Sequence, residues 1–260
     1  MASLRKGWSI QVRVIGALMV RELTTRFGRE NIGFLWVMAE PLLFALLVGF
    51  LARALKGPLE YGIEIVSFIV TGYIPLVLFR SCVQRGVSIF TANGSLLYHR
   101  QIKILDLVLV RFFIELIGGM MAYLFVALLL HTFGLFPVPY DMAFLLLGWF
   151  YYAHFAFAIS LIVAPLSEFS EVLEKIIPVI TYMTIPFSGA FYLAGSLYPA
   201  AANVVLYVPL VHGMEMMRYG VFGPTIDPQY DFFYPLAVSM VLMAIGLALC
   251  RVVRRRLVIE

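Results

Sequence analysis

Long apolar stretches separated by short polar segments dominate the chain from residue 32 to residue 250. A helix needs about 20 residues to cross the hydrocarbon core of a bilayer, and each stretch approaches or exceeds that length. The pattern predicts an all-α polytopic membrane protein with six transmembrane helices. The predicted spans are roughly 32–54, 64–84, 107–130, 142–165, 176–195 and 233–250.

Proline residues predict irregular structure in the second half of the chain. Pro178 and Pro186 fall inside the fifth span, so this helix is predicted to be kinked or broken. In the long loop 196–232, an apolar run at 200–211 follows Pro199 and is too short to cross a membrane. Runs of this length are typical of re-entrant or interfacial helices, which here would form a lid over a central path.

The segment before the first span is predicted to be an amphipathic helix. Trp8, Val12, Ile15 and Met19 share one helical face, and Arg13 lies opposite. Such a helix lies in the membrane interface, either as a simple anchor or with a further role. The chain therefore divides into two parts. Residues 1–31 form a cytoplasmic interfacial helix with its connection to the first span, and residues 32–260 form the six-helix membrane domain.

Composition and charge support this assignment and add an orientation. Hydrophobic residues make up 62% of the chain and charged residues 13%, whereas soluble domains carry about 25% charged residues. Between the spans, Lys and Arg gather on the side of the N-terminus, and only Lys56 and Arg218 lie on the other side. The positive-inside rule then predicts that both termini are cytoplasmic. Cys82 and Cys250 lie in or beside apolar runs, which argues against a disulfide framework or a cysteine metal site.

One inner loop runs against this charge rule. In the sequence PLSEFSEVLEK, Ser167 is predicted to cap a helix that carries Glu168, Glu171 and Glu174. An acidic helix at the cytoplasmic surface suits a basic groove on a partner protein, and we favour this interpretation. The alternative is that a short loop tolerates acidic residues, because they have little effect on topology.

Polar and aromatic residues inside the spans give several candidates. Glu40 precedes Pro41 in the first span, at a depth where ionisable groups usually face a bundle interior or a cavity. Arg111 and Glu115 are four residues apart, so an ion pair within one helix is predicted. An aromatic cluster near Tyr151 in the fourth span is consistent either with rings that stack on sugars or with ordinary core packing.

The motifs that would mark an enzyme do not occur in the sequence. There is no G-x-x-x-x-G-K-[ST] loop to hold phosphates and no H-E-x-x-H metal motif. The histidines are scattered, and no nucleophile–base set can be assembled. We therefore predict no catalytic, cofactor-binding or metal-binding residues. An active transporter built from this chain would take its energy from another subunit or from an ion gradient.

Three segments of the sequence resemble a known family. The first is RELTTRFGRENIGFLWVMAEPLL from Arg21 to Leu43, the second is NGSLLYHR from Asn93, and the third is P-L-V-H-x-x-E-x-x-R from Pro209 to Arg218. In this order and with this topology, they resemble type 2 ABC exporter permeases, most closely those that export capsular polysaccharide. The matching residues are Arg21, Arg26, Phe27, Gly28, Gly33, Trp36, Glu40, Pro41, Pro178, Pro209, His212, Glu215 and Arg218.

The resemblance implies an assembly in the bacterial inner membrane. A homodimer of this chain would bind two copies of a cytoplasmic ABC ATPase, which would hold ATP and Mg, while this chain binds no cofactor. Coupling helices near 91–103 and 166–175 would contact the ATPases. The cargo would be a lipid-linked acidic polysaccharide, passed to periplasmic and outer-membrane export proteins, and no nucleic acid is implied.

The candidate residues fall into three groups, and other functions remain open. The coupling candidates are Ser95, Leu97, Tyr98, Arg100, Glu168, Glu171 and Glu174. The channel candidates are Arg29, Trp36, Glu40, Tyr151, Tyr152 and Phe155. The periplasmic gate candidates are Phe191, Tyr192, His212, Glu215 and Arg218. Alternatives are a permease for O-antigen, teichoic acid or a drug, an ATPase-independent channel or secondary transporter, and a membrane enzyme that acts on lipid-linked glycans.

Overall fold

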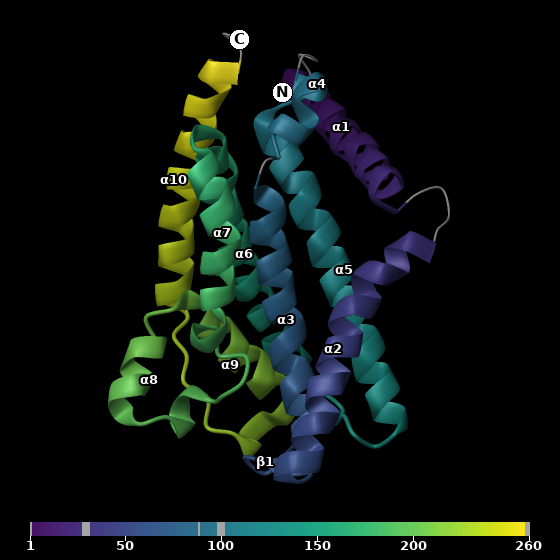
Figure 1. Cartoon of the computed structure of the whole chain (residues 1–260), viewed down its shortest axis with the longest axis vertical. Coiled ribbons are helices and arrows are strands. Elements are labelled where there is room, and N and C mark those ends of the chain that lie inside the picture. Colours follow the sequence, from purple (N-terminus) through teal and green to yellow (C-terminus); the bar gives the residue numbers. More distant parts are fainter. Residues whose placement is uncertain (1, 28–31, 88, 98–101, 258–260) are drawn as a thin grey trace.

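The chain folds into a bundle of long helices (Figure 1). The computed structural model describes residues 2–27, 32–87, 89–97 and 102–257. Its α-helices and strands are α1 (Ala2–Phe27), α2 (Ile32–Lys56), β1 (Leu59–Glu60), β2 (Ile63–Glu64), α3 (Ile65–Gly86), α4 (Gly94–Leu97), α5 (Ile104–Thr132), α6 (Met142–Phe169), α7 (Glu171–Met183), α8 (Pro199–Val205), α9 (Pro209–Phe222) and α10 (Phe233–Leu257). Short 3-10 helices cover Thr91–Asn93, Ile185–Phe187, Ala194–Ser196 and Gly223–Thr225.

The two ends of the bundle differ in what they carry. Both chain termini and α4 lie at one end, which we call the terminus end, and the β1–β2 hairpin and α8 lie at the other, the loop end (Figure 1). The hairpin pairs Leu59 with Glu64 and Glu60 with Ile63, and it is a detail that the apolar pattern did not predict.

The apolar runs of the sequence form helices of membrane-spanning length. Within the described residues, α3, α5, α6 and α10 are long and apolar enough to cross a bilayer. A fifth candidate is the pair formed by α8 and 209–225, which is bent by 104°. The prediction of an all-α polytopic membrane protein is thus confirmed at the level of four or five candidate spans.

The first and fifth predicted spans correspond less closely to single described helices. The first corresponds to α2, where most side chains before Pro41 lie outside the described residues. In the fifth, α7 ends at Met183 and is 13 residues long, about 20 Å at 1.5 Å per residue. The predicted break therefore occurs at Thr184–Pro186, where the 3-10 turn begins, whereas Pro178 lies inside α7.

The prediction that Ser167 caps the acidic helix is wrong. Helix α6 continues through Ser167, whose hydroxyl donates to the Ala164 carbonyl at 2.9 Å, and ends at Phe169. Ser170 is the extended residue between α6 and α7, with φ −159° and ψ 123°. The acidic residues are consequently divided between two helices, because α6 extends one turn beyond the predicted end of its apolar run.

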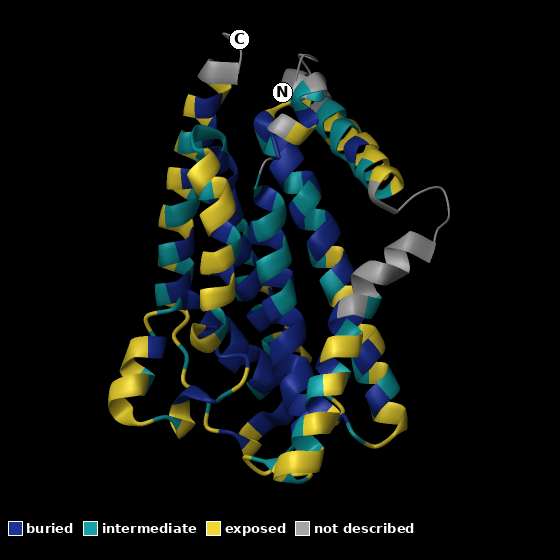
Figure 2. Cartoon of the chain, in the orientation of Figure 1, coloured by how far each residue is buried: buried dark blue, intermediate teal, exposed yellow. Residues whose placement is uncertain are grey.

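Helices α3 and α6 lie at the centre of the bundle and α5 and α10 at its edge. The most apolar window of α3 is 78% buried and that of α6 is 67% buried, against 39% for α5 and 22% for α10. Figure 2 shows the same contrast, with dark blue residues concentrated in α3 and exposed ones on α2, α7 and α10. The exposed apolar surface of these outer helices suits contact with lipid or with another membrane protein.

Close packing of α6 on α9 depends on small residues. A Cβ atom at Gly148 would lie 2.5 Å from the Met217 nitrogen, and one at Gly213 would lie 3.1 Å from the Gly148 carbonyl oxygen. Small residues let membrane helices approach closely where backbones cross. Helix α9 is accordingly enclosed: all of its residues are buried except Tyr219.

Helix α1 lies obliquely against the terminus end (Figure 1). Leu18 is buried against the base of α5, and the Arg21 guanidinium donates to the Asn93 side chain at 3.2 Å. Trp8 and Val12, on the other hand, are 73% and 52% exposed. The predicted face of Trp8, Val12, Ile15 and Met19 is therefore divided, because Ile15 and Met19 pack against the same core cluster as Leu18. The inward side of α1 holds the segment that precedes α4.

Candidate functional site

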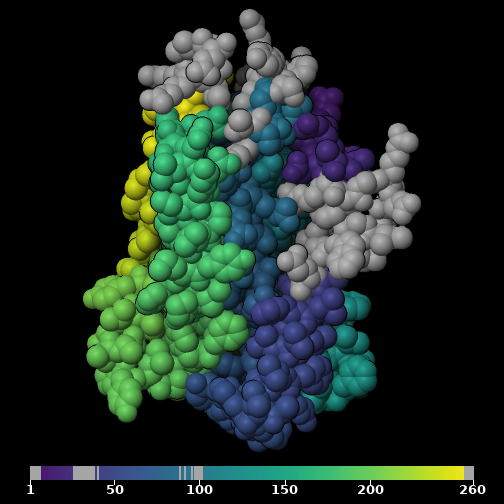
Figure 3. Space-filling view, viewed as in Figure 1, coloured from purple at the N-terminus to yellow at the C-terminus, as the bar shows by residue number. Residues whose placement is uncertain are grey.

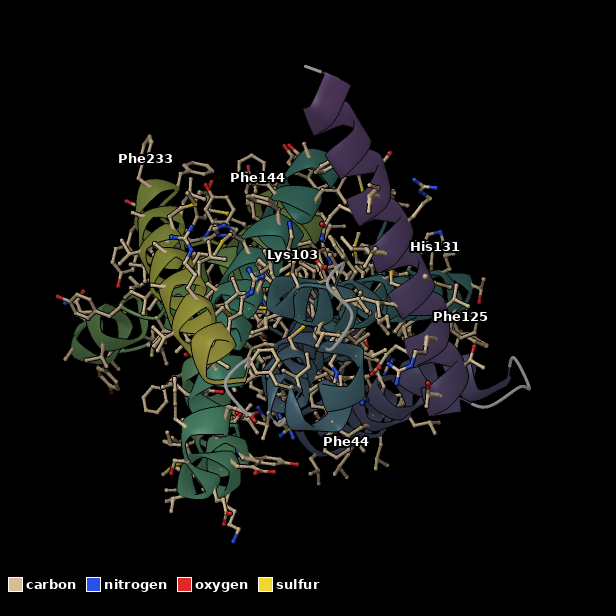
Figure 4. The ribbon with its side chains drawn as sticks, turned by 90° about the horizontal axis from the view of Figure 1, so that it is seen from above. Phe44, Lys103, Phe125, His131, Phe144 and Phe233 are labelled. Carbon is tan, nitrogen blue, oxygen red and sulfur yellow. The ribbon has the colours of Figure 1, made fainter. Side chains whose placement is uncertain are left out.

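One face of the bundle is formed by α2, α3 and α7. These helices lie side by side in Figure 3, where α7 is green and α2 and α3 are blue. Seen along the bundle in Figure 4, the labelled Phe44 of α2 lies at the opposite edge from Phe144 of α6. Exposed apolar side chains cover much of this face, and we call it the α2–α3–α7 face. Its exposed members include Leu43, Phe44, Leu47, Leu51, Ile176, Val179, Ile180, Tyr182 and Met183.

Aromatic rings meet at two levels of this face. Toward the loop end, Tyr73 of α3 stacks on Phe44 with a centroid distance of 4.9 Å, and the Phe191 ring lies 6.3 Å from Tyr73. Toward the terminus end, the Arg80 guanidinium of α3 lies 4.0 Å from the ring centroid of Tyr182 on α7. Since Tyr73 and Arg80 are two helical turns apart, the two levels are separated by about 10 Å.

Helix α9 supplies a buried polar cluster near the loop end. The Arg218 guanidinium donates to the Ala190 carbonyl at 2.6 Å and to the Tyr192 carbonyl, and its Cζ lies 3.9 Å from the Phe68 ring centroid. The Glu215 carboxylate accepts from two backbone amides at 3.1 Å, those of Ala194 and Gln229.

His212 completes this cluster. Its Nε2 lies 2.8 Å from the Leu206 carbonyl, and its Nδ1 accepts a hydrogen bond from the Asp231 amide at 2.8 Å. The second contact makes Nδ1 an acceptor, so the ring donates through Nε2. His212, Glu215 and Arg218 therefore tie three connecting segments to α9, and each of their recorded hydrogen bonds is made with backbone groups. This arrangement holds the connecting segments in position on α9.

The other gate candidates belong to one of these tied segments. Phe191 is 38% exposed and points a ring toward Tyr73, whereas Tyr192 is half-buried and offers its carbonyl to Arg218. The structure thus brings all five predicted gate residues into one neighbourhood, the segment 190–192 and the face of α9 beneath it. Their action as a gate stays a prediction.

The channel candidates are divided among different surroundings. Tyr152 and Phe155 are buried within α6, and the Tyr151 hydroxyl donates to the Phe232 carbonyl at 2.8 Å. These positions favour core packing, one of the two roles that the sequence left open. Arg29 lies outside the described residues, as do the side chains of Trp36 and Glu40, so their place on a path stays a prediction.

The coupling candidates lie at the terminus end. Glu168 is half-buried in the last turn of α6, and Glu171 and Glu174 are exposed in the first turn of α7. Ser95 and Leu97 belong to α4, with side chains outside the described part of the chain, and Tyr98 and Arg100 lie outside it entirely. Figure 1 places α4 and the start of α7 at the same end of the bundle.

Charged residues also connect the helices of the terminus end. The buried Glu115 carboxylate of α5 pairs with Arg85 of α3 at 2.6 Å, and Arg111 of α5 pairs with Glu22 of α1 at 3.5 Å. Arg111 donates as well to the Arg85 carbonyl. Sequence spacing predicted a pair within α5, and these contacts show that the same residues form bridges between helices.

The space between α5 and α6 is apolar. A cavity of about 520 Å³ lies between Leu124 and Leu128 of α5 and Met142 and Leu146 of α6. A smaller one of about 330 Å³ continues past Trp149. Carbon atoms dominate their walls, so these spaces suit hydrocarbon better than sugar.

Sequence reasoning missed Arg80 and Tyr182. Neither residue is among the candidates that the sequence predicts. A usable pattern was present, because Val77, Arg80, Ser81 and Gln84 follow helical spacing and three of the four are polar. Their neighbour on α7 lies 102 positions further along the chain, which spacing alone cannot reveal.

Comparison with known proteins gives a consistent result. Residues 13–222 match the family described as ABC-2 type transporter. The capsule polysaccharide export inner-membrane protein CtrC of Neisseria meningitidis serogroup B is 36% identical, with 93% of this chain and 91% of that protein covered. The protein of the same description, BexB, from Haemophilus influenzae is 32% identical over 96% and 94%. The polysialic acid transport protein KpsM of Escherichia coli is 26% identical over 95% and 96%.

Proposed function

Because this chain belongs to the ABC-2 type transporter family, we propose that it is the membrane permease of a capsular polysaccharide exporter. The observation that carries this proposal is the match to capsule export inner-membrane proteins over more than nine-tenths of the chain. The match includes α9 and the α2–α3–α7 face, so it is not confined to the general features of a membrane helix.

The orientation follows from charge and from the positions of the termini. Both termini lie at one end of the bundle, and Lys and Arg of the connecting segments are concentrated in the segments that belong to that end. The terminus end is therefore cytoplasmic and the loop end periplasmic in a bacterial inner membrane. We assign six spans to α2, α3, α5, α6, α7 with the segment after it, and α10, and we assign the bent pair α8–α9 to a re-entrant element.

A separate ATPase supplies the energy. The sequence has no phosphate-binding loop of its own, and the exposed carboxylates Glu171 and Glu174 project from the start of α7 at the terminus end. Two copies of a cytoplasmic ABC ATPase would bind ATP and Mg and contact the segments 91–103 and 166–175. Helix α1 supports the first of these segments through the Arg21–Asn93 hydrogen bond.

A second copy of the chain completes the path. The α2–α3–α7 face exposes large apolar residues such as Phe44 and Tyr182, which are 48% and 55% exposed. Two such faces in a homodimer would enclose a path for a lipid-linked acidic polysaccharide. Residues 190–192, held by α9, would close the periplasmic end of that path, beyond which periplasmic and outer-membrane export proteins would receive the glycan.

The proposal is tested by purification and by complementation. The tagged chain is purified from its native membrane in mild detergent, copurifying proteins are identified, and ATP hydrolysis is measured. In parallel, the gene is returned to a capsule-forming strain from which it has been deleted, and surface polysaccharide is quantified. We expect a stoichiometric ATPase partner and restored capsule.

Other results would assign a different function. A stoichiometric ATPase without any effect on surface capsule would indicate another cargo, such as O-antigen, teichoic acid or a drug. A chain that arrives alone and without nucleotide hydrolysis, even after chemical cross-linking in the membrane, would contradict the proposal and favour an ATPase-independent channel or secondary transporter.

A further inference from the structure

Helix α3 carries a narrow polar stripe on the α2–α3–α7 face. Val77, Arg80, Ser81 and Gln84 are half-buried, and their spacing places them on one side of the helix. From Ile65 to Val83, every residue outside this stripe is buried. In the half of α3 toward the terminus end, the partly exposed side chains are therefore mainly polar.

A polar stripe at this depth does not suit lipid. Arg80 lies six residues before the end of α3, about 9 Å along the helix. Ionisable groups inside membrane spans face a bundle interior or a water-filled cavity, because hydrocarbon cannot solvate them. The stripe belongs to the face that would enclose the glycan path, and it offers donors and acceptors to whatever passes there.

Arg80 has unused hydrogen-bonding capacity. Its Nε is buried and has no hydrogen-bond partner, and among the described residues no carboxylate pairs with it. Arg53 and Arg85, in contrast, pair with Glu64 and Glu115. A guanidinium has five N–H donors and no acceptor, so Arg80 is suited to an oxyanion that no described residue of the chain provides.

Tyr182 positions this guanidinium and exposes a ring beside it. The Arg80 Cζ lies 4.0 Å from the ring centroid of Tyr182, a cation–π geometry, and Tyr182 is 55% exposed. An exposed ring next to a cation is the combination that an acidic sugar requires. The ring packs on the apolar face of the sugar, and the guanidinium binds its carboxylate or phosphate, in the bidentate manner of charge-assisted pairs.

We propose that Arg80 and Tyr182 form an anion-binding site for the acidic groups of the glycan, on the wall of its path in the cytoplasmic half of the membrane. This inference rests on the proposed function and adds to it the residues that recognise the charge of the cargo. In a homodimer the site occurs twice, so two cations face a polymer that repeats its negative charge.

The experiment measures glycan held by a stalled complex. The permease is purified with its ATPase from cells that make the glycan, with the ATPase carrying a substitution that permits ATP binding but not hydrolysis. Acidic sugar and phospholipid phosphorus are quantified per permease after washes of increasing salt. The variants are Arg80→Gln, Arg80→Lys, Tyr182→Phe and Tyr182→Leu. Arg53→Gln is the matched control, because it removes an arginine at the other end of the membrane domain.

We expect Arg80→Gln to reduce retained glycan about tenfold, since charge-assisted hydrogen bonds are lost. Arg80→Lys should hold glycan at low salt and release it at lower salt than the wild type, because an ammonium lacks the bidentate geometry. Tyr182→Phe keeps the ring and should match the wild type, Tyr182→Leu should lose several-fold, and Arg53→Gln should change little.

Three results would overturn the inference. The first is that Arg80→Gln retains as much glycan as the wild type, and the second is that Arg53→Gln loses as much glycan as Arg80→Gln. The third is that Arg80→Gln loses bound phospholipid but no glycan, which would make Arg80 a headgroup anchor. If Arg80→Gln fails to assemble, Arg80→Lys decides, because a salt profile identical to that of the wild type contradicts the bidentate site. A wild-type complex that carries no glycan and restores no capsule contradicts the proposed function itself.

Discussion

The carbonyl oxygen of Ala190 occupies the space in which a side chain at Gly72 would lie, so that even a methyl group there would overlap it. The same carbonyl accepts a hydrogen bond from Arg218 at 2.6 Å. The segment that carries Phe191 is thus held between α3 on one side and α9 on the other. Small changes at either contact are expected to move it.

The first prediction concerns Gly72→Ala. The added methyl group must displace residues 190–192, and overpacking of this kind costs about 1–3 kcal/mol of stability. We expect a lower thermal unfolding temperature in detergent and reduced export. Gly16→Ala is the control, because a Cβ atom there meets nothing within 4 Å and Ala favours a helix. An unfolding temperature of Gly72→Ala equal to the wild type would contradict the contact.

The second prediction concerns the buried Arg218. Arg218→Met leaves the Ala190 and Tyr192 carbonyls without this donor and removes a positive charge that lies close to the buried Glu215. Removing one partner from a buried charged network costs about 3–5 kcal/mol.

A double-mutant cycle tests whether the two charges act together. Glu215→Gln alone should destabilise, and Arg218→Met with Glu215→Gln should lose less than the sum of the two single changes. Unfolding measured by near-ultraviolet circular dichroism gives all three values. Strict additivity would mean that Glu215 and Arg218 act independently on their separate loops.

Much of this architecture could be predicted from the sequence, because a membrane-spanning helix appears as one continuous apolar run. Helices α3, α5, α6 and α10 follow their predicted spans closely, since lipid as solvent requires about 20 apolar residues in each. Local capping rules failed at Ser167, because α6 continues by one turn and the Ser167 hydroxyl donates to the Ala164 carbonyl within that helix.

The surroundings of the site residues could not be predicted, because they are set by contacts between segments far apart in the sequence. The sequence grouped His212, Glu215 and Arg218 as gate candidates, but only the fold shows that their hydrogen-bond partners are backbone groups of distant loops. Arg80 required Tyr182 and the burial of the rest of α3 to become a candidate. Periodicity gives the face of a helix, and tertiary packing decides what that face meets.

The third prediction is a pH dependence at the start of α10. The Asp231 carboxylate accepts from the Phe233 and Tyr234 amides at 2.6 and 2.7 Å, and the bond from Tyr234 contributes most to holding the pKa of Asp231 below its ordinary value. A depressed folded-state pKa means that the cap is fully effective above the ordinary value of 3.8 and is lost as pH falls through the lower folded value.

Hydrogen exchange at Phe233 and Tyr234 measures this cap. After correction for intrinsic rates, protection should hold at neutral pH and fall only below about pH 4. Asp231→Asn keeps an acceptor and should give protection without the acid-dependent loss, whereas Asp231→Ala should lose protection at every pH. Acid-dependent loss that persists in Asp231→Asn would assign the effect to another group.

The fourth prediction concerns the acidic start of α7. Glu171 and Glu174 are exposed and lie on one helical face at the terminus end, where the ATPase is proposed to bind. Reversing both charges, Glu171→Lys with Glu174→Lys, replaces attraction by repulsion against a basic groove, and like charges at an interface cost several kcal/mol. We expect the ATPase to be lost on purification and capsule export to fall at least tenfold, while the unfolding temperature of the permease changes little.

Glu60→Lys is the matched control, because Glu60 is a carboxylate of the loop end whose ion pair with Lys56 is also near the surface. Since that end faces the periplasm in the proposed orientation, this change should leave ATPase binding intact. Loss of the ATPase in both variants, or in neither, would contradict the assignment of α7 as a contact for the energy-supplying subunit.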